Sequence, residues 1–288
     1  MMLTLGSRRL AAAAVAFAAA ASPACGTTGT TAGAPGPQAA PATPASFLYR
    51  PFEARYRVAS QNHTEQEFGG QVNAYDLALA YFVTAAATEA GDALHVSFTL
   101  DSVVSGSPLP PGVSAADFQS AVGATFSGTL SPSGEISDFQ ASEGTGQFLQ
   151  QLTTSLPRFF ARVPSGGAHP GQTWSDSSEV SAPSGGLDMQ ITTTTDYSAS
   201  QWGMHDGVEA LDVTAVSRYT ISGGGVQGGA EITVDGTGTS HARLVLGADG
   251  RMLGQTSADT ANFTATVIAM GAIIPVTQIR FDTVSVVR

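Results

Sequence analysis

The sequence has one cysteine, no lysine and few charged residues of any kind. Charged side chains make up 12% of its 288 residues, and the 12 basic ones, all arginines, are outnumbered by 23 acids. A chain this acidic repels phosphate backbones, which excludes nucleic acid as a partner. The single cysteine cannot form a disulfide within the chain, so a folded domain must be stabilised by burial alone.

Apolar runs are also short, and none reaches the roughly 20 residues that a membrane-spanning helix needs. The longest, residues 10–21, follows Arg8 and Arg9 and ends at the small residues 22–24. A positive segment, a short apolar segment and a small-residue cleavage site are the three parts of a secretory signal. The sequence therefore predicts a signal peptide over residues 1–24.

Cys25 directly follows that cleavage site. The run Ser22-Pro23-Ala24-Cys25 resembles the lipobox of bacterial lipoproteins, in which the cysteine carries a diacylglycerol and the new N-terminus a further acyl chain. The alternative is ordinary cleavage at the same bond, which leaves a free thiol. Two or three acyl chains anchor a protein stably. The resemblance implies a protein anchored to a membrane of the cell envelope through its N-terminus, facing the periplasm or the exterior.

Residues 26–46 are mostly Gly, Thr, Ala and Pro and carry no charge. Such a segment cannot bury enough surface to offset its ordering entropy. We therefore expect residues 25–46 to be the lipidated N-terminus and a disordered linker. The folded domain is predicted over residues 47–288.

That domain is dominated by alternation of apolar and polar residues, which is typical of strands with one buried face. Alternation of this one-sided kind favours antiparallel pairing, because parallel strands are buried on both faces. We therefore predict a mainly β fold, a curved antiparallel sheet or half-barrel with one or two covering helices. The clearest alternating segments are 76–87, 93–100, 187–197, 211–221 and 273–287.

Two tight turns indicate an internal duplication. Residues 131–134 and 247–250 each end a strand segment and close on a glycine, which supplies the positive φ that hairpin loops need. Gly134 and Gly250 are 116 residues apart, as are Gly91 and Gly207. We predict that residues 52–140 and 173–257 are equivalent halves. The glycines at 223–225 and 228–229 are expected to separate two strands.

Helical spacing occurs mainly in residues 142–163, between the two halves, and Pro157 must break this helix. A shorter helical turn is expected near Ser114. The longer segment would cover the open side of the sheet, where its large side chains either line a hydrophobic ligand site or complete the core. The ligand-binding residues predicted on this basis are Phe148, Leu149, Leu152, Leu156, Phe159 and Phe160.

Residue patterns that carry catalysis are missing. The five histidines show no metal-binding spacing, there is no G-x-S-x-G motif, and without lysine no Schiff base can form. Arg158 and Arg162 could form an anion clamp, although a solvated helix face is the simpler interpretation. We expect no enzyme, no cofactor and no metal site.

The lipobox, the linker and the long antiparallel strands interrupted by helices resemble bacterial envelope lipoproteins. The nearest fold is that of the half-barrel lipid carriers typified by LolA, LolB and LppX, in which a curved sheet wraps acyl chains beneath a helical lid. The resemblance implies an envelope-tethered protein that binds a lipid or another hydrophobic ligand. The alternative is a structural or protein-interaction lipoprotein with a solid core and no ligand.

Overall fold

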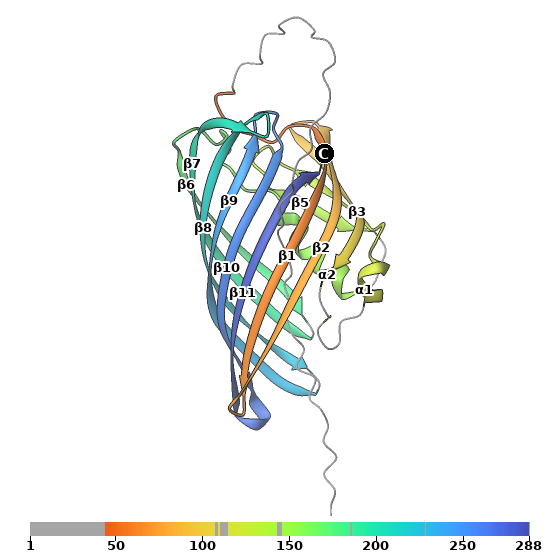
Figure 1. The fold of residues 1–288 in the computed structure, drawn as a ribbon, viewed down its shortest axis with the longest axis vertical. Helices are drawn as coiled ribbons and strands as arrows, with labels where there is room; N and C mark the ends of the chain where they lie inside the picture. The colour runs from red at the N-terminus through yellow and green to blue at the C-terminus, as the bar shows by residue number, and fades with distance from the viewer. Residues whose placement is uncertain are drawn as a thin grey trace, which may run out of the picture.

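The computed structural model describes residues 44–106, 109, 115–142, 146–184, 186–227 and 229–287. Within these ranges eleven strands form a single antiparallel sheet (Figure 1). The strands are β1 (Phe52–Phe68), β2 (Gln71–Ala90), β3 (Ala93–Ser105), β4 (Thr125–Leu130), β5 (Ile136–Ala141), β6 (Thr173–Ser184), β7 (Leu187–His205), β8 (Val208–Gln227), β9 (Ala230–Gly247), β10 (Met252–Val267) and β11 (Ala272–Val287).

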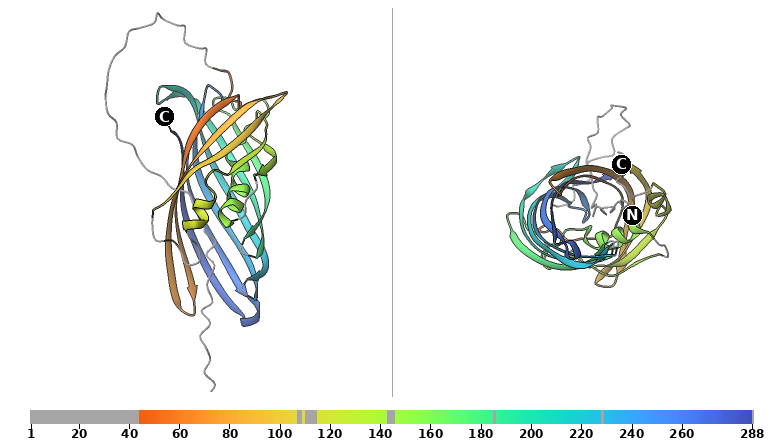
Figure 2. Two further views of the ribbon diagram at one scale, coloured as in Figure 1. Left: turned by 90° about the vertical axis from the view of Figure 1, so that its right-hand side faces the viewer. Right: turned by 90° about the horizontal axis from the view of Figure 1, so that it is seen from below.

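The sheet is one long meander with a single exception. Its order is β5-β4-β3-β2-β1-β11-β10-β9-β8-β7-β6, so every strand neighbours its successor in sequence except β5, whose successor β6 lies at the opposite edge. The first strand, β1, joins the last, β11, at the centre. The sheet is strongly curved but open, and the short β5 and the longer β6 are its two edges (Figure 2). The longest strands, β2 and β8, have 20 residues, which corresponds to about 65 Å. The predicted fold class, a curved antiparallel sheet, is confirmed.

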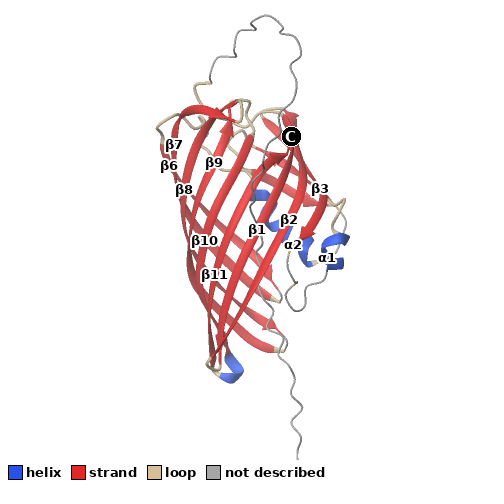
Figure 3. Cartoon of the chain, in the orientation of Figure 1, coloured by secondary structure: helices blue, strands red, loops and turns tan. Residues whose placement is uncertain are grey.

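Four short helical segments accompany the sheet (Figure 3) within the part of the chain that the structure describes: α1 (Ala115–Ser120), α2 (Gln147–Ser155), η1 (Leu156–Arg158) and η2 (Ile268–Met270). The segment expected to be helical over 142–163 is helical only over α2 and η1. Pro157 marks the change, because it lies in the first turn of η1 and ends the regular α-helix. Among the described residues, no helix has the length and apolar character needed to cross a membrane.

The concave face of the sheet contains the main core. Residues that pair directly across a ladder share a face, so Tyr56, opposite both Val83 and Val286, points the same way as they do. The aromatic rings that directly follow η1 pack there: Phe159 lies 5.1 Å from Tyr56 and 5.6 Å from Phe98, between ring centroids. The helical connection between β5 and β6 therefore fills the curve of the sheet.

The strands of the two predicted halves follow the same order, although α1, between β3 and β4, has no counterpart between β8 and β9 among the described residues. Strands β1–β5 and β6–β10 are five-strand meanders that run in the same direction around the sheet, and β11 lies between them. Gly91 and Gly207 have positive φ at the β2–β3 and β7–β8 turns, and Gly134 and Gly250 at the β4–β5 and β9–β10 turns. The halves differ in length, because β4 and β5 have six residues each where β9 has 18 and β10 has 16.

One expected break between strands is wrong. Gly223–Gly225 continue β8, which ends at Gln227, and Gly229 lies in the turn before β9. The reason is packing, because a Cβ at Gly223 would lie 2.7 Å from Sδ of Met189 and one at Gly225 only 2.3 Å from the carbonyl oxygen of Gly186. These glycines allow close contact between β7 and β8 instead of ending a strand.

Candidate functional site

The six residues predicted to line a ligand site are all buried in the main core. Phe148 contacts Tyr81 and Phe118, and Phe160 contacts Phe98. Even the most accessible of the six, Phe159, has only 9% of its surface exposed. The structure thus brings the six predicted residues together on the concave face of the sheet. Other side chains of the protein, and not a ligand cavity, surround them.

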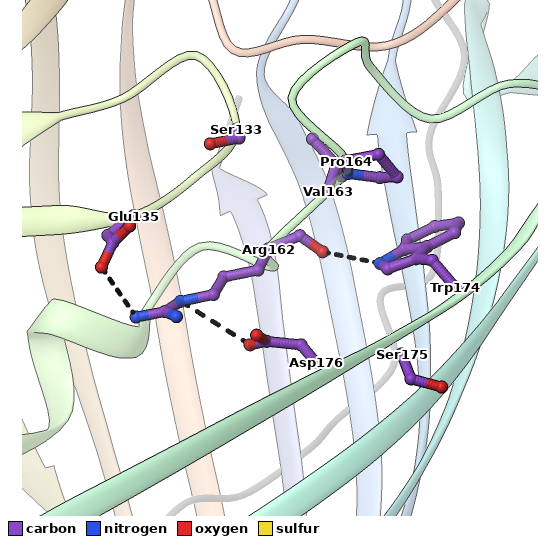
Figure 4. A pocket seen from close by; sticks show the side chains of 8 residues that line it. All are labelled: Ser133, Glu135, Arg162, Val163, Pro164, Trp174, Ser175 and Asp176. Carbon is purple, nitrogen blue, oxygen red and sulfur yellow. Dashed lines mark hydrogen bonds and ion pairs between the residues drawn. The ribbon is translucent and has the colours of Figure 1, made fainter.

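The strand edges meet at a hollow of about 290 Å³ (Figure 4). It lies where β5 and β6 leave the sheet open, and it is lined by Ser133, Glu135, Arg162, Val163, Pro164, Trp174, Ser175 and Asp176. Ligand sites usually have roughly 300–1,000 Å³ and mostly apolar walls. This hollow is at the lower limit of that range, and five of its eight lining side chains are charged or bear a hydroxyl group, so it does not suit a lipid.

Arg162 joins the two edges across this hollow. Its guanidinium lies 3.3 Å from Glu135, beside β5, and 3.7 Å from Asp176 on β6. Its carbonyl accepts a hydrogen bond of 3.1 Å from the indole nitrogen of Trp174. Because two carboxylates already neutralise Arg162, it is a bridge between strand edges and does not form the anion clamp considered with Arg158.

A second group of polar residues lies on the concave face below the main core. Arg280 on β11 pairs across the ladders with Asn62 on β1 and with Asp259 on β10. Its guanidinium binds Asp282, with nitrogen–oxygen distances of 2.7 and 3.0 Å. Ser60 donates a hydrogen bond of 3.3 Å to the same carboxylate. We call Arg280, Asp282, Asp259, Ser60 and Asn62 the inner polar cluster.

Burial changes the ionisation of this cluster. The pKa of Asp259 is raised because burial disfavours the charged carboxylate, and a hydrogen bond from Tyr219 partly offsets this. The pKa of Tyr219 is raised by its own burial and by the neighbouring Asp259. Asn62 is only 4% exposed, and its Oδ1 has no hydrogen-bond partner among the described residues. A buried acceptor without a donor costs free energy, so this atom marks a place where a polar group could bind.

The histidines do not gather into a site. His63 contacts Asp76 at 2.8 Å and Glu65 at 3.2 Å on the exposed side of β1. The hydrogen bonds that its ring donates to these carboxylates raise its pKa, the bond to Asp76 most. His169 contacts the carbonyl of Ala45 through Nδ1 at 3.1 Å. Among the residues that could be placed, no group of His, Cys, Asp and Glu is arranged to hold a metal ion. Cys25 and residues 1–43 lie outside the described part of the chain.

No protein-family model matches this chain, and no curated protein matches it. Sequence reasoning missed the inner polar cluster, although β1 carried a signal for it. In that strand Val58 is followed on the same face by Ser60, Asn62 and Thr64. The inward-facing side chains of β1 thus change from apolar to polar along the strand. Arg280 lies opposite Asn62, and Asp259 lies opposite Arg280. The first of these pairs joins β1 to β11, which are far apart in sequence, so a local pattern could not reveal it.

Proposed function

We propose that this protein is an envelope lipoprotein, anchored through acyl chains on Cys25, whose domain acts through contacts at its surface. The observation that carries the proposal is the filling of the part of the concave face that lies under the helical connection. Phe159 and Phe160 of the helical connection pack against Tyr56 and Phe98, so side chains of the protein occupy the space that a carrier would reserve for acyl chains.

The N-terminal end of the domain supports the same proposal. Tyr49 is buried, and its hydroxyl donates a hydrogen bond of 3.1 Å to the carbonyl of Ala161. Its backbone amide donates to Pro132 at 2.9 Å, and that of Arg50 to Gly250 at 3.1 Å. Residues 49 and 50 thus bind the segment between β5 and β6, the β4–β5 turn and the β9–β10 turn. They cover that end of the core.

The test is the lipid content of the full-length protein purified from its own membrane. We expect lipid covalently attached to Cys25 and no other lipid in stoichiometric amount after native mass spectrometry. One tightly held, extractable lipid per chain would overturn the solid-core proposal and would favour a carrier.

A carrier of a hydrophobic ligand with a polar headgroup is the second candidate, and the inner polar cluster is the observation that favours it. A headgroup hydroxyl or amine could donate to Oδ1 of Asn62, beside the ion pair of Arg280 and Asp282. If extractable lipid is found, Asn62→Leu should lower its amount, whereas Asn73→Leu, at an exposed position of β2, should leave it unchanged.

A further inference from the structure

Two neighbouring hairpins form an exposed apolar tip at the end of the domain opposite residues 49–50. The β1–β2 turn and the β10–β11 turn lie side by side, because β1 and β11 pair as far as Gln66 and Val276 (Figures 1 and 2). Five large apolar side chains on these hairpins are between 46% and 66% exposed. We call them the apolar tip: Phe68, Val72, Ile268, Met270 and Ile273.

The composition of the β10–β11 hairpin is unusual for an exposed turn. None of the residues 260–279 is charged, and residues 267–276 are all apolar, including the η2 turn itself. Turns at the other end of the sheet are different, since each carries or adjoins charged side chains: Glu89 and Asp92, Glu135, Asp206, and Asp249 with Arg251. The β10–β11 hairpin therefore differs from the turns at the other end, and an exposed apolar patch of this kind marks an interaction site.

We propose that the apolar tip inserts into the surface of a lipid bilayer. The tip projects from the ends of two hairpins, so its side chains can enter a soft apolar layer without the matching pocket that a protein partner would need. Uncharged residues on both strands behind the turn can enter the headgroup region with it. The acids Glu65 and Glu67, next to Phe68, would be repelled by anionic headgroups, so the preferred surface is zwitterionic.

The chain before residue 44 permits this contact on a membrane-anchored protein. Residue 44 precedes the segment that binds Pro132 and Gly250, at the end opposite the tip. Fully extended, residues 26–43 span at most about 65 Å, which is roughly the length of β2 and β8. A domain anchored at Cys25 can therefore bring its apolar tip to a bilayer. This inference deepens the proposed function by naming lipid as the component that the surface contacts.

The experiment uses the solitary cysteine of the chain. The full chain with Cys25→Ser has no cysteine and no acylation site, so a second substitution supplies one thiol for an environment-sensitive fluorophore. Met270→Cys places the label at the tip. Met204→Cys is the matched control. Met204 is exposed at the C-terminal end of β7, which lies at the end of the domain opposite the apolar tip. Any binding by residues 1–24 is common to both proteins, so their difference reports the tip.

With phosphatidylcholine vesicles, we expect blue-shifted, brighter emission and quenching by spin-labelled lipid from the label at position 270, and neither from that at 204. In vesicle flotation, Met270→Asp should weaken binding about tenfold, the change expected from losing the burial of one large apolar side chain, relative to Met204→Asp. Unchanged emission at position 270 would overturn the proposal. So would a shift that depends on protein concentration without vesicles, which would indicate contact with a second copy. Neither result would alter the lipid-extraction test of the solid core.

Discussion

The hydroxyl of Tyr219 donates a hydrogen bond to Asp259 at 2.7 Å, although a strand lies between the two residues. Tyr219 is on β8 and Asp259 on β10, and the strand between them, β9, presents Gly238 where the tyrosine ring crosses. A Cβ at position 238 would lie 2.1 Å from Cζ of that ring. Glycine at this position thus leaves room for the tyrosine ring to cross β9. The ring then places its hydroxyl against Asp259, one carboxylate of the inner polar cluster.

Removing this hydroxyl should make stability more dependent on pH. Burial raises the pKa of Asp259 in the folded protein, so the unfolded chain loses this proton at a lower pH and stability falls as pH rises through the raised pKa. Tyr219→Phe removes a hydrogen bond that favours the carboxylate and raises that pKa further. We expect the substitution to cost about 1 kcal/mol more at pH 7 than at pH 4, measured by urea unfolding.

The control is Tyr219→Phe made in an Asp259→Asn background, where position 259 no longer titrates. There the cost of the substitution should be the same at both pH values. A cost in the wild-type background that does not change with pH would contradict the assignment of Asp259 as the titrating group.

The sequence allows the antiparallel strands and the helical cover to be predicted, because both depend on short-range patterns. Alternation marks the buried face of β3 through Leu94, Val96 and Phe98, and these residues lie in the core. Whether a covering aromatic such as Phe159 lines a cavity or fills it depends on how far the sheet curves. That curvature depends on the pairing of all eleven strands, including β1 with β11 from the two ends of the domain, which no local pattern records.

His63 should titrate above the ordinary histidine value of 6.5 in the folded protein, because the contacts with Asp76 and Glu65 favour the imidazolium. A folded pKa above the unfolded one means that His63 stabilises the fold at low pH, and that this contribution is lost as pH rises through the folded pKa. Proton NMR of the imidazole gives the value directly. Asp76→Asn should lower it, whereas a titration unchanged by that substitution would show that Asp76 is not the main cause.

Cys25→Ser should release the protein from membranes if the cysteine is acylated, because a single apolar tip binds lipid more weakly than two or three acyl chains. Fractionation of cells that express each form provides the measurement. Mass spectrometry of the mature N-terminus should show an acylated Cys25 in the wild type. Full retention of the serine variant in the membrane fraction would exclude acylation as the main anchor.

Phe159→Ala distinguishes a solid core from a ligand cavity, because the two arrangements predict different costs. In the structure Phe159 contacts Tyr56, Phe98 and Phe160, so truncation leaves a void among rings that cannot collapse into it. We expect a loss of about 3–5 kcal/mol in the free energy of unfolding. Phe281→Ala, at a half-exposed position of β11, should cost less than about 1 kcal/mol. If Phe159 instead faced a space kept for ligand, its truncation would enlarge that space at small cost in stability and would change the lipid content. A mild loss at position 159 together with altered lipid would therefore reject the solid core.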